Sequence, residues 1–189
     1  MTINYIRIDE VDSTNNYLKA NRSQLPDGSL VIAGLQTAGK GRRGHDWLAD
    51  RGMLPFSFLL KNPPHPDNVT LCAAVAVAKT LASWVPGEEF GIKWPNDIIL
   101  RGHKVCGILC ESTLKSSCDG AIYNNVICGM GLNVNQDADF FEKSGLVNAA
   151  SLYTLTGNKY DKMLAAEYIV DELTRLIDED FSTVINEYS

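Results

Sequence analysis

The sequence predicts an α+β fold in which helices flank a mixed, largely antiparallel sheet. Strand-like segments follow one another across short turns more often than they alternate with helices, an order that favours antiparallel pairing. Two longer segments, 67–84 and 160–188, instead carry apolar residues at helical spacing. A chain of 189 residues suits one domain, so we expect 1–189 to form a single unit.

The predicted strands are short and apolar, and turn residues separate them. Pro26, Asp27 and Gly28 form one turn signal, and Gly102 marks a tight turn between two strands. The predicted strands are 3–8, 30–36, 53–60, 90–94, 97–101, 104–111 and 122–133.

Three helical segments are predicted. Ser13 and Thr14 offer N-cap chemistry for a short helix that ends near Asn21. Segment 67–84 is a core helix with Val69, Ala73, Val77 and Leu81 on one face. Segment 160–188 has a predicted break near 178–180, and its apolar face is marked by Leu164, Ile169, Leu173, Leu176, Ile177, Val184 and Ile185.

Composition indicates an ordinary globular protein, with 45% apolar residues, 21% charged residues and a net charge of -6. No apolar run approaches the roughly 20 residues of a membrane span, and the first residues lack a signal-peptide pattern. The five cysteines form no C-x-x-C pair and only three histidines accompany them, which disfavours a zinc site. We therefore expect reduced, mostly buried thiols in a cytoplasmic protein.

The most informative segment is 36–47, because three glycines and three cations fall within residues 39–44 of an acidic chain. Glycine lets backbone approach an anion closely, and Lys and Arg neutralise it. A P-loop requires Ser or Thr where Gly41 stands. A dinucleotide-binding loop requires a helix after the glycines, and segment 45–52 lacks the apolar spacing of a helix. We therefore interpret the segment as a phosphate-handling loop, with a solvated loop as the alternative.

Three further segments carry candidate chemistry, each with a plainer alternative. In 93–97, Asp97 suits a general base or a magnesium ligand, or a simple Asx-turn. In 104–111, Gly107 inside a strand indicates a ligand that lies against the backbone. Lys104 either stands at the mouth of an apolar slot or is an edge-strand lysine that prevents aggregation. In 129–135, two glycines beside Asn133 suit a purine or a β-bulge.

Taken together and in this order, these segments resemble the catalytic domain of biotin protein ligases, in the biotin/lipoate protein ligase family, over about residues 5–180. The resemblance rests on Ser-Thr-Asn at 13–15, Gln-Thr-Ala-Gly-Lys-Gly-Arg-Arg-Gly at 36–44, Lys-Trp-Pro-Asn-Asp at 93–97, Lys-Val-Cys-Gly-Ile-Leu-Cys-Glu at 104–111 and Gly-Met-Gly-Leu-Asn-Val-Asn at 129–135.

The resemblance implies a fold related to class II aminoacyl-tRNA synthetases and an enzyme that uses ATP and Mg²⁺. Biotin is first activated to biotinyl-5'-AMP, with release of pyrophosphate. It is then transferred to a lysine of a biotin carboxyl carrier domain of a biotin-dependent carboxylase. Self-association into a homodimer through a sheet edge is common in the family.

The resemblance also implies roles for individual residues. The catalytic candidates are Lys104, Arg42 and Asp97. The biotin-binding candidates are Ser13, Thr14, Asn15, Gln36, Gly39, Lys40, Gly41, Arg42, Lys104, Gly107 and Ile108. The ATP-binding candidates are Lys40, Arg42, Arg43, Gly44, Trp47, Lys93, Asn96, Gly131 and Asn133. Magnesium is expected to enter with ATP, and no protein ligand is assigned beyond Asp97 as a candidate.

The chain also departs from the family pattern. Lys40 stands where the family usually has Arg, which removes a bidentate contact, and Gly34 and His45 replace an acid and an Arg. We expect the N-terminal DNA-binding domain and the C-terminal small β-barrel of the family to be absent, and we expect no DNA binding. Two alternatives stay open: a lipoate or octanoate ligase or transferase on the same fold, and a non-catalytic biotin-binding module. The motifs at 36–44 and 93–97 favour biotin.

Overall fold

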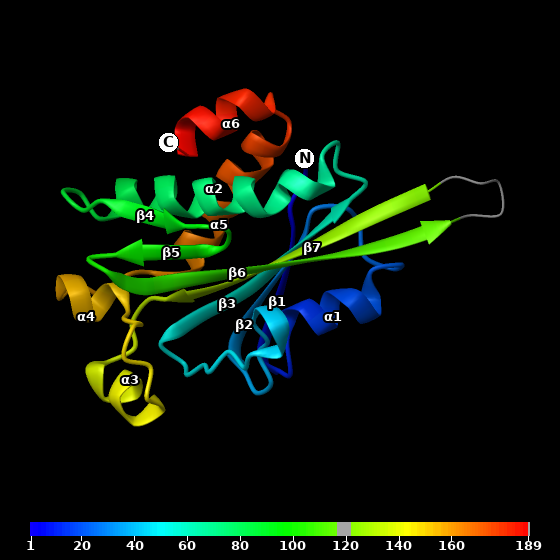
Figure 1. Ribbon diagram of the computed structural model, residues 1–189. Coiled ribbons are helices and arrows are strands. Elements are labelled where there is room, and N and C mark those ends of the chain that lie inside the picture. The colour runs from blue at the N-terminus through cyan, green and yellow to red at the C-terminus, as the bar shows by residue number, and fades with distance from the viewer. Residues whose placement is uncertain (117–121, 189) are drawn as a thin grey trace.

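The computed structural model describes residues 1–116 and 122–188, so Cys118 lies outside the described residues. Its centre is a seven-stranded sheet in the order β1-β2-β3-β7-β6-β5-β4 (Figure 1). β1 and β2 pair in parallel, and the other neighbouring strands pair antiparallel, which confirms the predicted mixed sheet. The strands are β1 Asn4–Val11, β2 Ser29–Gln36, β3 Met53–Lys61, β4 Phe90–Lys93, β5 Asp97–Leu100, β6 His103–Ser116 and β7 Ile122–Asn133.

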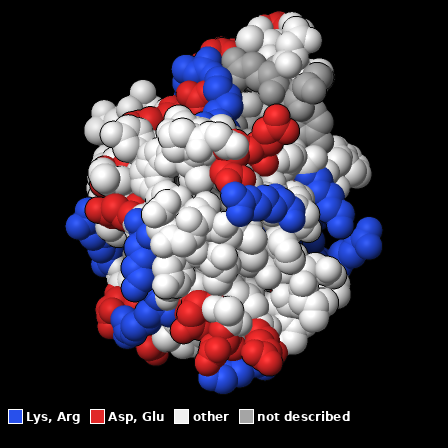
Figure 2. All heavy atoms as spheres, turned by 90° about the vertical axis from the view of Figure 1, so that its left-hand side faces the viewer, with Lys and Arg blue, Asp and Glu red and all other residues white. Residues whose placement is uncertain are grey.

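Helices lie on both faces of this sheet (Figure 1). The longer ones, α2 and α5, pack against each other on one face, and α1 covers part of the opposite face. Acidic side chains gather over α3, on the lower part of the face in Figure 2. The helices are α1 Thr14–Asn21, α2 Val69–Trp84, α3 Ala138–Ser144, α4 Leu152–Thr156, α5 Lys162–Ile177 and α6 Phe181–Tyr188.

Alternation along the strands divides the apolar residues between two cores, because successive side chains point to opposite faces. In β3, Phe56 and Phe58 join the large core under α2 and α5, whereas Leu59 faces α1. The smaller core contains Leu18, Val31, Leu59 and Ile127. Because this core covers only part of the α1 face, the rest of that face is open to other contacts.

The structure confirms the predicted helix positions and corrects some details. Ser13 is the N-cap of α1, and α5 and α6 are separated at 178–180 as expected. The predicted apolar face of 160–188 is wrong for Leu164 and Ile185, whose exposed fractions are 44% and 41%. The short helices α3 and α4 are absent from the predicted elements, because seven and five residues show too few turns for a clear period.

The described cysteines are unbridged thiols. Cys72, Cys106 and Cys128 are buried, and burial raises the pKa of the Cys72 thiol to about 11 and of Cys106 to about 12. These two thiols stay protonated, and therefore weakly nucleophilic, at neutral pH. Across 1–116 and 122–188, no helix has the length and apolar character that crossing a membrane requires.

The contrast between Leu173 and Leu164 on α5 provides a stability prediction. Leu173 is fully buried in the large core, so Leu173→Ala is expected to lower the free energy of unfolding by about 2–5 kcal/mol. The exposed Leu164 is the matched control, and Leu164→Ala is expected to cost less than about 0.5 kcal/mol. Urea unfolding of both variants measures the difference, and equal losses would contradict this assignment of the apolar face.

Candidate functional site

The glycine-rich loop connects β2 to β3 and folds back on itself. Lys40 pairs with Asp46 through both backbone and side chain, with Nζ 2.7 Å from Oδ1, and the amide of Trp47 donates to the Gly39 carbonyl at 2.9 Å. The hydrogen bond and charge of Lys40 lower the pKa of Asp46 below its usual value. Only a short 3-10 turn, Arg42–Gly44, follows the first glycines. Dinucleotide-binding loops and P-loops both continue into a helix at this point, so the short turn disfavours both, as the sequence predicts.

A pocket lies where this loop crosses the uncovered part of the sheet. Its base is a glycine floor, formed by Gly107 on β6 and by Gly129 and Gly131 on β7. The Trp47 indole lies on this floor, because a Cβ at Gly107 or at Gly131 would come within 2.6 Å of its ring. The indole nitrogen also lies 3.1 Å from the sulfur of Met53.

One side of the pocket, the polar side, consists of uncharged polar residues from α1 and β2: Ser13, Thr14, Asn15 and Gln36. Ser13 caps α1, so the helix begins at the pocket. The amide and hydroxyl of Thr14 both donate to Oε1 of Gln36, at 2.8 and 2.9 Å. Asn15 lies over Gly129, where a Cβ would come within 2.1 Å of its oxygen.

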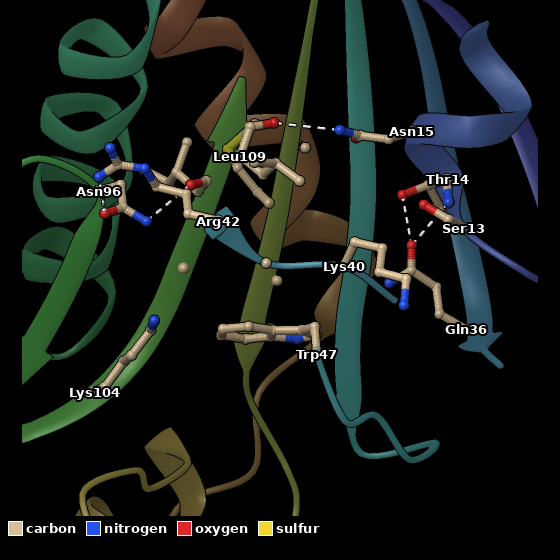
Figure 3. A pocket seen from close by; sticks show the side chains of 16 residues that line it. Ser13, Thr14, Asn15, Gln36, Lys40, Arg42, Trp47, Asn96, Lys104 and Leu109 are labelled. Carbon is tan, nitrogen blue, oxygen red and sulfur yellow. Dashed lines mark hydrogen bonds between the residues drawn. The ribbon is translucent and has the colours of Figure 1, made fainter. Parts of the chain in front are cut away.

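The opposite side, the cationic side, contains Arg42 from the loop and Lys104 from β6 (Figure 3). Lys104 Nζ lies 2.7 Å from Oδ1 of Asp97 and 4.9 Å from the centre of the Trp47 ring. Arg42 donates to Oδ1 of Asn96 at 3.1 Å, and Asn96 donates in turn to the Ile108 carbonyl. The predicted catalytic residues Lys104, Arg42 and Asp97 therefore lie together.

Most predicted site residues converge here, but several do not line this pocket. Gly44 faces open space with a φ of +78°, and Gly39 supports the base of the loop against Gln36 and Trp47. The exposed Lys93 lines a neighbouring hollow near β4. Arg43 and Asn133 line a second hollow beside Lys104.

Asn133, which is predicted to contact ATP, also bonds to neighbouring residues of the protein. Its oxygen accepts from Gln136 at 2.9 Å and its amide nitrogen lies 3.5 Å from the Lys104 carbonyl. The side chain is buried and its polar atoms have partners within the protein. Asn133 therefore links β7 to the start of β6, and its role as an ATP contact stays a prediction.

Sequence reasoning missed Ser57, which is fully buried on β3 behind the polar side. Its hydroxyl oxygen lies 2.6 Å from Oγ1 of Thr14 and 2.6 Å from Oδ1 of Asn15. A lone hydroxyl in the otherwise apolar segment 53–60 was the available signal, because a buried polar group needs a partner. Glu111 on β6 ends the motif at 104–111 but is not among the predicted site residues.

The pocket encloses only about 60 Å³ while Trp47 rests on the glycine floor. Pockets for drug-sized ligands typically measure about 300–1,000 Å³. An occupant of that size therefore requires the indole and its loop to move. The Lys40–Asp46 pair lies within the loop, whereas the hydrogen bond from Arg42 to Asn96 links the loop to the segment before β5, and a ligand can replace it.

Comparison with known proteins gives a family match. Residues 7–133 match the model of the Biotin/lipoate A/B protein ligase family. The chain belongs to this family. It is 35% identical over 167 residues to the bifunctional ligase/repressor BirA of Bacillus spizizenii, covering 86% of this chain and 49% of that protein.

Two further relatives are named as biotin protein ligases. It is 36% identical over 138 residues to the biotin--[acetyl-CoA-carboxylase] ligase of Mycobacterium tuberculosis, covering 68% of this chain and 48% of the relative. The Aquifex aeolicus biotin protein ligase, solved with biotin and ATP, has a TM-score of 0.73 and 30% identity, covering 92% of this chain and 70% of that one. The chain thus spans about half the length of the curated relatives it matches.

The contact between Trp47 and Gly107 gives a prediction that needs no ligand. Gly107→Ala is expected to displace the indole, because the new Cβ would lie 2.6 Å from its ring. Acrylamide quenching of tryptophan fluorescence, in a background with Trp84 and Trp94 changed to Phe, should then show a more accessible Trp47. Gly91→Ala is the matched control, since a Cβ at that strand position meets nothing within 4 Å. Equal quenching in both variants would contradict the contact.

Proposed function

We propose that this chain is the catalytic part of an ATP-dependent biotin protein ligase. Such an enzyme joins the carboxylate of biotin to the α-phosphate of ATP, forming biotinyl-5'-AMP and pyrophosphate. It then transfers biotin to a lysine of a carrier domain, with release of AMP. A relative named as a biotin--[acetyl-CoA-carboxylase] ligase and a related structure with biotin and ATP support the proposal.

The observation that carries the proposal is the chemical difference between the two sides of the pocket. The polar side offers hydrogen-bonding oxygens and N–H groups without net charge, and the ureido ring of biotin has N–H donors and a carbonyl acceptor to match them. The cationic side offers Arg42 and Lys104, which suit the carboxylate at the other end of biotin and the phosphate it attacks. Biotin has both features in one molecule.

The same observation disfavours lipoate and octanoate. A dithiolane ring or an alkyl chain has no N–H or carbonyl group to pair with Thr14, Asn15 and Gln36, two of which are buried. These groups pair within the protein without a ligand, and each further hydrogen bond that biotin adds to them contributes about 0.5–1.5 kcal/mol that lipoate and octanoate do not gain. A pocket built around these residues therefore discriminates against such ligands.

Lys104 and Arg42 act on the adenylation step. Two anions, a carboxylate and a triphosphate, must approach each other, and cations aimed at the reacting oxygens lower the cost. Lys104 leaves Asp97 to contact the carboxylate and the α-phosphate, and Arg42 contacts the phosphates from the loop. The released Asp97 then accepts a hydrogen bond from the incoming lysine amine and orients it. The loop closes over the adenylate and excludes water, which would hydrolyse it.

The nucleotide occupies the second hollow, beside Lys104 and Trp47, with the indole available to stack on adenine. In the part of the chain that the structure describes, no three His, Cys, Asp or Glu side chains lie together as a metal cluster. Magnesium would be held together with the phosphates of ATP, and Asp97 is our candidate protein ligand. When bound, the ion would neutralise phosphate charge.

The carrier domain of a biotin-dependent carboxylase is the proposed acceptor, and a cytoplasmic location and a homodimer stay predictions. The proposal concerns only the 189 residues of this sequence.

Lys104→Ala tests the chemical step. Biotin-dependent exchange between ATP and pyrophosphate is expected to fall by about 100-fold or more, because a cation aimed at the developing charge is removed. Lys143→Ala, on exposed α3, is the matched control and should leave exchange unchanged. Unchanged exchange in Lys104→Ala would remove Lys104 from the mechanism. Biotin binding without exchange in the parent chain would support the binding module instead.

Arg42→Gly tests retention of the adenylate. Its guanidinium bonds to Asn96 and holds the loop near β6, so its loss is expected to let biotinyl-5'-AMP escape. Free adenylate released per pyrophosphate formed should rise severalfold, measured by chromatography of the filtered reaction. Arg7→Gly, on an exposed side chain of β1, is the control. A ratio equal to that of the parent would exclude a retaining role.

A further inference from the structure

We infer that Glu111 is a positioning residue that sets the orientation of the Asn15 amide, and so decides which hydrogen bonds the polar side offers to a ligand. Glu111 does not line the pocket and acts through Asn15, which does. The positioning role of Glu111 is inferred from hydrogen-bond geometry alone. Only the identity of the ligand rests on the proposed function.

An asparagine amide can be turned over, which exchanges its oxygen and its NH₂ group. On the β6 side, the Asn15 nitrogen lies 2.7 Å from Oε2 of Glu111 and 3.3 Å from the Leu109 carbonyl. A carboxylate and a carbonyl only accept hydrogen bonds, so the NH₂ group must face them. On the other side Ser57 either donates or accepts and does not decide the orientation. The acceptors on β6 therefore do.

Strand register brings these groups into one row. Ser57 on β3 and Leu109 on β6 both pair with Gly129 on the strand between them. The Asn15 side chain lies across Gly129, because a Cβ there would come within 2.1 Å of its oxygen. The amide thus lies over one glycine, with its two ends directed to two different strands.

Lys19 holds the second oxygen of the same carboxylate. Its Nζ lies 2.6 Å from Oε1 of Glu111, and it follows Asn15 by four residues on α1, so both side chains leave the same face of the helix. With Oε1 bound to Lys19, Oε2 stays directed at Asn15. The Glu111 side chain is 31% exposed, so solvent screens its charge. Its effect on Asn15 therefore comes mainly from the directed hydrogen bond.

The orientation decides what a ligand meets. Ser57 has one hydroxyl hydrogen and lies 2.6 Å from the side-chain oxygens of both Asn15 and Thr14. The Asn15 oxygen has two lone pairs, so it can accept from a ligand N–H whether or not Ser57 also donates to it. If the amide turned over, its NH₂ group would face this position and oppose the N–H groups of a ureido ring. Glu111 thereby selects ligands that donate hydrogen bonds.

The first experiment compares Glu111→Ala with Glu111→Gln. Glu111→Ala removes the acceptor, and the KM for biotin is expected to rise about tenfold or more, with kcat and the KM for ATP within about twofold of the parent. Glu111→Gln keeps an acceptor oxygen and should lie within about threefold of the parent for biotin. Glu88→Ala removes a carboxylate from an ion pair with Arg101 outside the pocket and is the control. An unchanged KM for biotin in Glu111→Ala overturns the inference.

A reciprocal exchange separates orientation from general damage. Asn15→Asp places a second carboxylate against Glu111 and is expected to raise the KM for biotin by about 100-fold. Adding Glu111→Gln replaces the facing carboxylate by an amide, whose NH₂ group can donate to the new Asp side chain. The double variant should therefore lower the raised KM for biotin by at least about tenfold. The double variant is expected to keep an oxygen facing Ser57. If Glu111→Gln does not improve Asn15→Asp, the orientation model is wrong.

A ligand-free measurement keeps this inference separate from the proposed function. In spectra of ¹⁵N-labelled protein, the Asn15 side-chain NH₂ signals should shift in Glu111→Ala and stay near the parent in Glu88→Ala. If they shift while the parent releases no pyrophosphate with biotin and ATP, the proposed function fails and the positioning role stands. If they do not move, the positioning role fails whatever the substrate is.

Discussion

Gly107, Gly129 and Gly131 leave backbone uncovered on two neighbouring strands of the sheet, and the site depends on this close approach. Asn15 and the Trp47 indole both lie where a Cβ would stand. Any larger side chain would push α1 or the loop away from the sheet, and the two sides of the pocket would separate. Glycine weakens a strand, but β7 is paired on both sides, with β3 and β6, so its neighbours hold it in place.

The two sides of the pocket differ because different segments supply them. The start of α1 and the end of β2 contribute neutral polar groups, whereas the loop and β6 contribute cations to a chain of net charge -6. Each cation already has a partner: Lys40 has Asp46, Lys104 has Asp97, and Arg42 has Asn96. An anionic ligand exchanges partners rather than meeting free charges, so its net gain is smaller than the contacts suggest. The same pairs hold these three side chains in place.

Local sequence predicted most of the fold. The strands alternate, the turn at Gly102 has a positive φ of 80°, and Ser13 caps α1 as its chemistry indicates. Leu164 and Ile185 were misplaced because helical spacing alone leaves the limits of a buried face uncertain by one position, and neighbouring helices set those limits. The bonds of Asn133 with Gln136 and the Lys104 backbone are contacts that spacing does not reveal.

The sequence by itself determined the residue types of the site: glycines that permit close approach, a dense group of cations, and uncharged polar residues at a helix start. Those properties are local, because they depend on side-chain chemistry and on turns of a few residues. Only the tertiary structure decided that Ser57 and Glu111 stand at opposite ends of one amide. Strand register across β3, β7 and β6 sets that arrangement, and register is fixed by the burial of whole faces of the sheet.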